Sequence, residues 1–113
     1  MHEMSLAEGV LQIVEGSARR EGFGAVRVVR LEIGELAGVE IDALRLCFDA
    51  VARGGIADGA RLEIERTPGG AWCRRCAKMV PVAARLDPCP DCGTHQLQVC
   101  AGTEMRVRDL EVT

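Results

Sequence analysis

The sequence predicts an α+β fold in which two amphipathic helices pack on a three-stranded sheet, with a cysteine-rich segment inserted between two of the strands. Apolar residues recur at helical spacing in two segments and alternate with charged residues in three others, and four of the six cysteines form two Cys-x2-Cys pairs. With 113 residues, the chain is long enough for one compact core plus an appendage, but too short for two ordinary domains.

The first predicted helix begins near Leu6. Ser5 followed by Glu8 is a capping-box pattern, in which each side chain satisfies a free backbone N–H at the start of a helix. Gly22 and Gly24 end the helical pattern. The apolar stripe between these limits comprises Leu6, Val10, Ile13 and Val14.

A half-buried strand follows at residues 28–33, where the period changes to two. Val29, Leu31 and Ile33 alternate with Arg30 and Glu32. A turn bracketed by two glycines then leads into the second predicted helix, whose apolar positions are Ile41, Leu44, Phe48 and Val51.

Two further strands complete the predicted sheet. Leu62 and Ile64 alternate with charged residues before a linker at residues 67–70. Near the end of the chain Met105 and Val107 lie on one face, but Leu110 and Val112 fall on the opposite parity, which predicts a bulge or a strand exposed on both faces. The expected domains are therefore 1–68 with 98–113, and an insertion at 69–97.

The inserted segment contains Cys73, Cys76, Cys89 and Cys92. Two such pairs are typical of a zinc-ribbon-like domain, because each pair turns tightly and directs two thiolates at one ion. Four thiolates give a tetrahedral structural site without an open position. With few apolar residues between the pairs, metal binding is expected to supply much of the folding free energy of this domain.

Alternatives to a zinc site are two disulfides, a redox dithiol pair or an iron centre of the same geometry. Paired spacing in a reducing compartment favours metal ligands over disulfides, and two symmetrical pairs in a small ribbon hold zinc more often than iron. Cys47 and Cys100 are interpreted as packing residues. His95, three residues past Cys92, is interpreted as an exposed loop histidine, with a replacement metal ligand or a residue that contacts a ligand as the alternative.

Composition and charge exclude several classes of function. The net charge of −3 and an aromatic content of 3% with no tyrosine argue against nucleic acid as the partner. The sequence contains no apolar run long enough to span a bilayer and its first residues do not resemble a secretory signal, so a cytoplasmic protein that binds no membrane is expected. An enzyme is not expected, because no nucleophile and base form a recognisable pattern.

The amino terminus offers a second kind of metal chemistry. The terminal amine, the ionised peptide nitrogen of His2 and its imidazole can chelate one ion through fused rings. Nickel(II) and copper(II) favour tetragonal nitrogen sites of this kind, whereas zinc and magnesium do not. The pattern therefore indicates a class of metal. Intrinsic affinity favours copper within that class, so selective binding of nickel depends on the geometry of the site and on copper being kept scarce.

These features together resemble the HypA/HybF nickel metallochaperones of [NiFe]-hydrogenase maturation. The resemblance covers essentially the whole chain. It rests on the start Met1-His2-Glu3-x-Ser5-Leu6, the Gly34-Glu35-Leu36 turn, Phe48 in its helix and the two cysteine pairs.

The resemblance implies a nickel-binding α+β domain with an inserted zinc domain. His2 matches the histidine that holds nickel in the family, with the Met1 amine and the backbone nitrogens of His2 and Glu3 completing the chelate. Glu3 matches the motif as a residue that orients or tunes the site, and Glu40 occupies the place of an acidic residue near the nickel. The four paired cysteines match the zinc ligands.

The resemblance also implies partners. A nickel-binding maturation GTPase similar to HypB and the precursor of the hydrogenase large subunit are expected to exchange nickel with a monomer or homodimer of this chain. The alternative interpretation is a zinc-ribbon module that binds nucleic acid or a transcription complex, which uses the cysteine pairs and leaves the amino terminus without a role.

Overall fold

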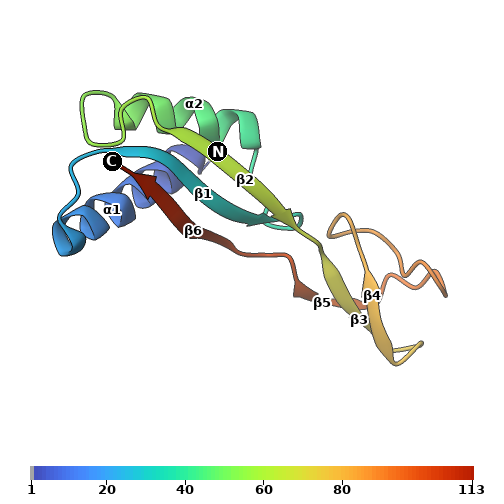
Figure 1. Ribbon diagram of the computed structural model, residues 1–113. Helices are drawn as coiled ribbons and strands as arrows, with labels where there is room; N and C mark the ends of the chain where they lie inside the picture. The colour runs from blue at the N-terminus through green and yellow to red at the C-terminus, as the bar shows by residue number, and fades with distance from the viewer. Residues whose placement is uncertain (1) are drawn as a thin grey trace. The chain divides into compact units, whose positions relative to one another are not determined.

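The computed structural model describes residues 2–113, which form two helices and six strands (Figure 1). The order along the chain is α1 (Glu3–Glu21), β1 (Val26–Gly34), α2 (Ile41–Ala52), β2 (Arg61–Thr67), β3 (Gly70–Cys73), β4 (Lys78–Pro81), β5 (Leu97–Ala101) and β6 (Met105–Val112). The predicted α+β class is confirmed, and so are both helices and the three strands predicted outside the cysteine-rich segment.

Helix α1 begins earlier than the capping-box pattern predicted. Its N-cap is His2, which makes no side-chain capping bond, and its first backbone bond runs from the Leu6 N–H to the His2 carbonyl at 3.0 Å. Ser5 therefore lies inside the first turn, and the predicted start near Leu6 is wrong. The C-cap is Gly22, whose N–H bonds to the Ala18 carbonyl, as the glycines predicted.

The chain divides into two compact units. The first comprises Met1–Leu31, Val39–Ile64 and Val107–Thr113, and the second comprises Glu32–Gly38 and Glu65–Arg106. The insertion predicted at 69–97 lies within the second unit, which also contains residues 32–38, 65–68 and 98–106.

The core of the first unit lies where α1 and α2 pack against each other and along the sheet (Figure 1). Phe48 and Leu44 are almost fully buried, as the period of α2 predicted. The remaining buried residues come from α1, β1, α2, β2 and the segment between α2 and β2, and include Ala7, Val10, Val14, Val26, Val28, Val29, Leu31, Ala52, Ala57, Ala60 and Leu62. Burial of each large aliphatic or aromatic side chain contributes about 1.5–3 kcal/mol.

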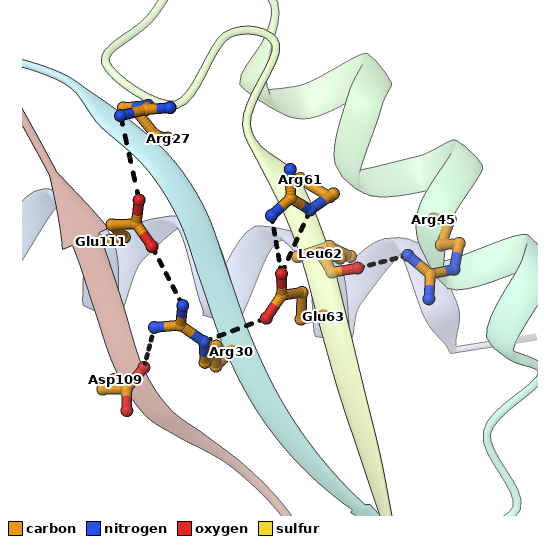
Figure 2. A network of polar contacts seen from close by, with 8 residues as sticks. All are labelled: Arg27, Arg30, Arg45, Arg61, Leu62, Glu63, Asp109 and Glu111. Carbon is orange, nitrogen blue, oxygen red and sulfur yellow. Dashed lines mark hydrogen bonds and ion pairs between the residues drawn. The ribbon is translucent and has the colours of Figure 1, made fainter.

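The first sheet has the strand order β2-β1-β6, so the last strand of the chain returns to the sheet, as predicted, and pairs there with β1. Arg30 on β1 joins all three strands (Figure 2). Its guanidinium donates to Glu63 on β2 and to Asp109 and Glu111 on β6, each at 3.0 Å. The three carboxylates raise the pKa of Arg30, because each stabilises the charged guanidinium.

The second sheet was not predicted strand by strand. It has the order β4-β3-β5, and both pairings with β3 are antiparallel. The linker predicted at 67–70 is shorter in the structure, because β2 ends at Thr67 and β3 begins at Gly70. These strands have four or five residues each, which is too few for a period to stand out in the sequence.

The turn after β1 packs within the second unit. The N–H of Leu36 bonds to the Gly102 carbonyl, and the Leu36 side chain is buried among residues of the cysteine-rich segment. Gly34 is required for this packing, since a Cβ there would lie 2.0 Å from the Gly102 oxygen. Neither helix in residues 2–113 has the length and hydropathy that a membrane span requires.

Candidate metal centres

The first cysteine pair lies at the end of β3. Cys73 is the last residue of the strand, and the turn that follows directs the backbone N–H of Cys76 at the Cys73 sulfur, 3.4 Å away. Ala77, directly after Cys76, has a φ of 53°, in the left-handed region. The tight turn brings both sulfurs to one side of the hairpin formed by β3 and β4.

The second pair forms a turn of the same kind. Gly93 follows Cys92 with a φ of 77°, and its N–H bonds to the Cys89 carbonyl at 2.9 Å. Burial raises the pKa of the Cys89 thiol, but the backbone N–H groups of Cys92 and Asp91 more than offset this and lower it to about 7. Hydrogen bonds from backbone N–H groups stabilise a thiolate at the position where a metal needs one.

The four sulfurs converge. Cys73 Sγ lies 3.6 Å from Cys92 Sγ, Cys76 Sγ lies 3.9 Å from Cys89 Sγ, and all four lie within 4.8 Å of one another. A zinc–sulfur bond of about 2.3 Å gives sulfur–sulfur edges of about 3.8 Å in a tetrahedron. The spacing therefore fits zinc, and it is far longer than the bond of about 2.05 Å in a disulfide.

The electrostatics of the cluster also favour a cation. The pKa of the Cys76 thiol rises to about 12, through its hydrogen bond to Cys92, its burial and the adjacent sulfurs of Cys73 and Cys89. Four sulfurs this close cannot all ionise without a positive charge between them. A divalent metal provides that charge and makes all four available as thiolate ligands.

A small apolar shell holds the cysteine turns in place. Cys73 and Cys89 are buried with Leu36, Ala71, Val80 and Val82. Lys78 on β4 forms an ion pair with Asp91, which ties β4 to the second cysteine turn. Sequence reasoning missed Leu36 as a member of this shell, because it lies far from the cysteines along the chain.

At the amino terminus, the described residues place the predicted nickel ligands at the start of α1. Met1 lies outside the described residues. His2 is half buried and occupies the N-cap, and Glu3 is buried as the first helical residue. Neither amide takes part in the helical ladder, because both come before the first intrahelical bond, which runs from the Leu6 N–H to the His2 carbonyl.

Glu3 and Glu40 meet through a backbone contact. The Glu3 carboxylate accepts the N–H of Glu40 at 3.1 Å, and the Glu40 carboxylate accepts the N–H of Asp42, which makes Glu40 the N-cap of α2. The pKa of Glu3 is lowered to about 2 by the positive charge of the amino terminus and then by the Glu40 amide. Glu3 therefore stays ionised and fixes the start of α2 beside the start of α1.

The side chains of His2, Glu3 and Glu40 do not form a metal-ligand group by themselves. In the part of the chain that the structure describes, the cysteine quartet is the only group of three or more histidine, cysteine or acidic side chains that converges. His95 is exposed between the second cysteine turn and β5, outside the quartet. Cys47 is half buried and Cys100 is exposed. The prediction that Cys100 packs in a core is therefore wrong.

Comparisons with known proteins agree over the whole chain. A family model described as hydrogenase/urease nickel incorporation, metallochaperone, HypA, matches residues 1–112. A hydrogenase maturation factor HypA from Alkalilimnicola ehrlichii is 61% identical over 112 residues, with 99% of each chain covered. Its counterpart from Albidiferax ferrireducens is 60% identical over the same length and coverage.

Solved structures share the fold. The solution structure of the Ni metallochaperone HypA from Helicobacter pylori superposes with a TM-score of 0.70 at 22% identity, covering 99% of this chain and 97% of the other. A second solution structure, of a HypA protein, gives a TM-score of 0.71 at 23% identity, covering 100% of this chain and 97% of the other. At this level of identity the likeness concerns the fold.

Proposed function

The chain belongs to the HypA family of metallochaperones that incorporate nickel into hydrogenase and urease, and from this premise we propose that it holds Ni(II) at its amino terminus. The ligands are the amine of Met1, the imidazole of His2 and the backbone nitrogens of His2 and Glu3. The observation that carries the proposal is the position of His2 as the N-cap of α1.

A helix start suits a chelate built from ionised peptide nitrogens. Elsewhere in a helix, removing an amide proton for a metal breaks a backbone hydrogen bond. The amides of His2 and Glu3 precede the first ladder bond, which runs from Leu6 to His2, so helix α1 loses none of its own bonds when nickel binds. Planar nitrogen ligands of this type favour nickel(II) and copper(II) over zinc.

Glu3 and Glu40 have positioning roles in this proposal. The Glu3 carboxylate bonds to the Glu40 amide, and Glu40 caps α2 through Asp42, so the chelating segment is joined to the start of the second helix. Glu40 then affects nickel through the position of Glu3, and no direct bond from its carboxylate to the metal is needed.

Zinc in the cysteine quartet has a structural role. Residues 69–97 are the proposed zinc-binding domain, with Cys73, Cys76, Cys89 and Cys92 as ligands, and residues 1–68 with 98–113 are the proposed nickel-binding domain. Four thiolates leave no open position on the metal, so this site supplies folding free energy and performs no chemistry.

Nickel is the cargo in this proposal and hydrogenase maturation is its destination. The partners are a HypB-like maturation GTPase and the hydrogenase large-subunit precursor, and the chain acts as a monomer or homodimer without catalysing a reaction. A cytoplasmic location accords with four reduced thiols serving as metal ligands. Neither nucleic acid nor a membrane has a part in this proposal.

The first test is a nickel titration of zinc-loaded protein with its native amino terminus. Calorimetry and absorption in the visible range report affinity and planar nitrogen coordination. His2→Ala removes the imidazole, and a variant extended before Met1 moves the amine away while leaving every side chain in place. We expect both changes to abolish one nickel site with the zinc content unchanged.

Three outcomes would count against the proposal. Equal nickel binding by native and extended proteins would exclude the amine as a ligand. Loss of zinc together with nickel in the His2 variant would place nickel at the cysteine quartet. Absence of nickel binding by the native protein would leave a zinc-dependent interaction module as the better account.

A further inference from the structure

The outer face of the sheet β4-β3-β5 carries the only tryptophan of the chain. Trp72 on β3 lies opposite Met79 on β4 and opposite Gln98 on β5. The alternating neighbours Ala71 and Val80 belong to the buried shell around the cysteines, so Trp72 and Met79 point to the other side. They remain 39% and 49% exposed, although both are large and apolar.

A glycine keeps this face open. An added Cβ on Gly70 would lie 3.4 Å from both the Met79 Cε and the Ala101 Cβ, which places these two atoms on the same face as Trp72. Ala101 is exposed as well. Trp72, Met79, Gln98 and Ala101 form what we call the Trp72 face, which extends over all three strands.

Two free cations lie in the turn that follows β3. Arg74 and Arg75, in the first cysteine turn, are exposed, and within residues 2–113 neither side chain has an ion-pair partner. The nearby Lys78, in contrast, is already paired with Asp91. Arg74 also lines, with Gln96, Leu97 and Gln98, a hollow of about 340 Å³ beside the face.

We propose that the Trp72 face is a docking surface for an acidic segment of a partner protein that carries a bulky apolar side chain. Tryptophan, methionine and arginine are enriched in protein interfaces, where an aromatic anchor lies at the centre and charges at the rim. The free guanidinium groups of Arg74 and Arg75 complement carboxylates, which they bind in a forked geometry. The proposal concerns the second unit alone and goes beyond the nickel site.

Nucleic acid fits this surface less well. Its binding strength grows with the number of phosphates neutralised, and the Trp72 face offers two free arginines on a chain with a net charge of −3. One aromatic side chain also gives one stacking position, whereas single-strand binders use several. An acidic peptide needs only a few matched charges around an apolar contact.

The sequence supplies its own reporter for a test. Because Trp72 is the only tryptophan and tyrosine is absent, the tryptophan emission of the full-length, zinc-loaded protein comes from this face alone. The probe is a synthetic peptide in which aspartates and glutamates flank one leucine and one phenylalanine, beside a peptide with lysines in place of the acids. We expect a saturable change in emission with the acidic peptide only, weakened by added salt.

Charge reversal separates the Trp72 face from general electrostatics. The double variant Arg74→Glu/Arg75→Glu keeps the reporter and is expected to weaken binding at least about tenfold. The double variant Arg19→Glu/Arg53→Glu makes the same change in charge on the first unit and should bind as the native protein does. Met79→Gln, which removes the apolar contact without changing the charge, should weaken binding with the zinc content unchanged, and His2→Ala should have no effect.

Several results would overturn the proposal. One is the absence of a saturable change in emission when the acidic peptide is added. Another is that the two double variants weaken peptide binding equally. A stronger response to a single-stranded oligonucleotide than to the peptide would assign the face to nucleic acid. An emission that changes on dilution of the protein alone would assign it to a second copy of this chain.

Discussion

At the scale of single residues, the two cysteine turns differ by one methyl group at equivalent positions. Gly93 follows Cys92 with a φ of 77°, and Ala77 follows Cys76 with a φ of 53°. An L-residue in this region costs about 1–2 kcal/mol, which glycine avoids. Nothing lies within 4 Å of a Cβ added at Gly93, so the cost of a substitution there comes from the backbone alone.

We therefore expect Gly93→Ala to lower the stability of the zinc-loaded protein by about 1 kcal/mol. Ala77→Gly should raise it by about 0.5 kcal/mol, because relief of the backbone strain exceeds the extra entropy of the unfolded chain. Urea unfolding followed by Trp72 emission measures both changes. Effects of the same sign in the two variants would show that the backbone conformation does not decide the outcome.

Glu3 is expected to make stability depend on pH in the acid range. Its pKa is lowered from an ordinary 4.5 to about 2 in the folded protein. A carboxyl with a depressed pKa contributes stability that is complete above the unfolded pKa and is lost as the pH falls through the folded one. Glu3→Gln should thus be less stable than the native protein at neutral pH, with the difference shrinking from pH 4.5 towards 2.

The matched control for Glu3 is Glu8→Gln, since Glu8 is exposed on the same helix. Chemical unfolding at a series of pH values measures the difference between each variant and the native protein. A Glu3 variant whose difference stays constant across the acid range would contradict the role given to the amino terminus and the Glu40 amide.

At the scale of elements, α2 offers a matched pair of apolar residues. Phe48 is 1% exposed, whereas Leu46, two positions before it, is 73% exposed. Phe48→Ala leaves a cavity and should cost about 3–5 kcal/mol. Leu46→Ala should change stability by no more than about 0.5 kcal/mol. Urea unfolding followed by circular dichroism measures both, and comparable losses would mean that Leu46 is covered in solution.

The first sheet gathers three carboxylates around one arginine. Arg30 pairs with Glu63, Asp109 and Glu111, so Arg30→Met leaves three carboxylates side by side on adjacent strands (Figure 2). Added salt screens their repulsion. We expect the stability of Arg30→Met to rise with sodium chloride concentration, and that of the native protein to fall or stay level.

Arg61→Met is the control for Arg30, because Arg61 has Glu63 as its one acidic partner among the described residues. Thermal unfolding over a range of salt concentrations measures both variants. If the two respond to salt alike, the convergence of three carboxylates on Arg30 has no special part in holding β6 to the sheet.

At the scale of the whole molecule, the two units draw on different sources of stability. The second unit has a buried shell of four aliphatic residues and two cysteines, so its folding is expected to depend on zinc. Removal of zinc with a strong chelator should shift the emission of Trp72 to longer wavelength and leave the helical circular dichroism of α1 and α2. Cys73→Ser should have the same effect.

Cys100→Ser is the control for zinc removal, because Cys100 is an exposed cysteine outside the quartet. It should retain zinc and the native emission. If helical circular dichroism is lost at the same chelator concentration as the native Trp72 emission, the two units unfold as one and zinc stabilises both.

The elements of this protein could be predicted from sequence to the extent that a regular pattern marks them. The apolar periods of β1 and α2 predict that Leu31, Leu44 and Phe48 lie in the core, and all three are buried in the structure. The capping box at Ser5 and Glu8 predicted the wrong helix start, since α1 continues back to Glu3 with His2 as its cap. A local pattern cannot tell which of two possible starts is stabilised by packing, and here Glu3 is buried and bonded to Glu40.

The sequence by itself determined the cysteine cluster, because the spacing of Cys73, Cys76, Cys89 and Cys92 encodes two tight turns locally, and it predicts a nickel chelate from the histidine in position two. Only the tertiary structure decided which distant groups complete each site. It places the Glu40 amide on the Glu3 carboxylate, Leu36 in the shell of the cysteines, and Trp72 opposite Met79 on an exposed sheet face. Local patterns record backbone conformation, whereas contacts between segments depend on how whole elements pack.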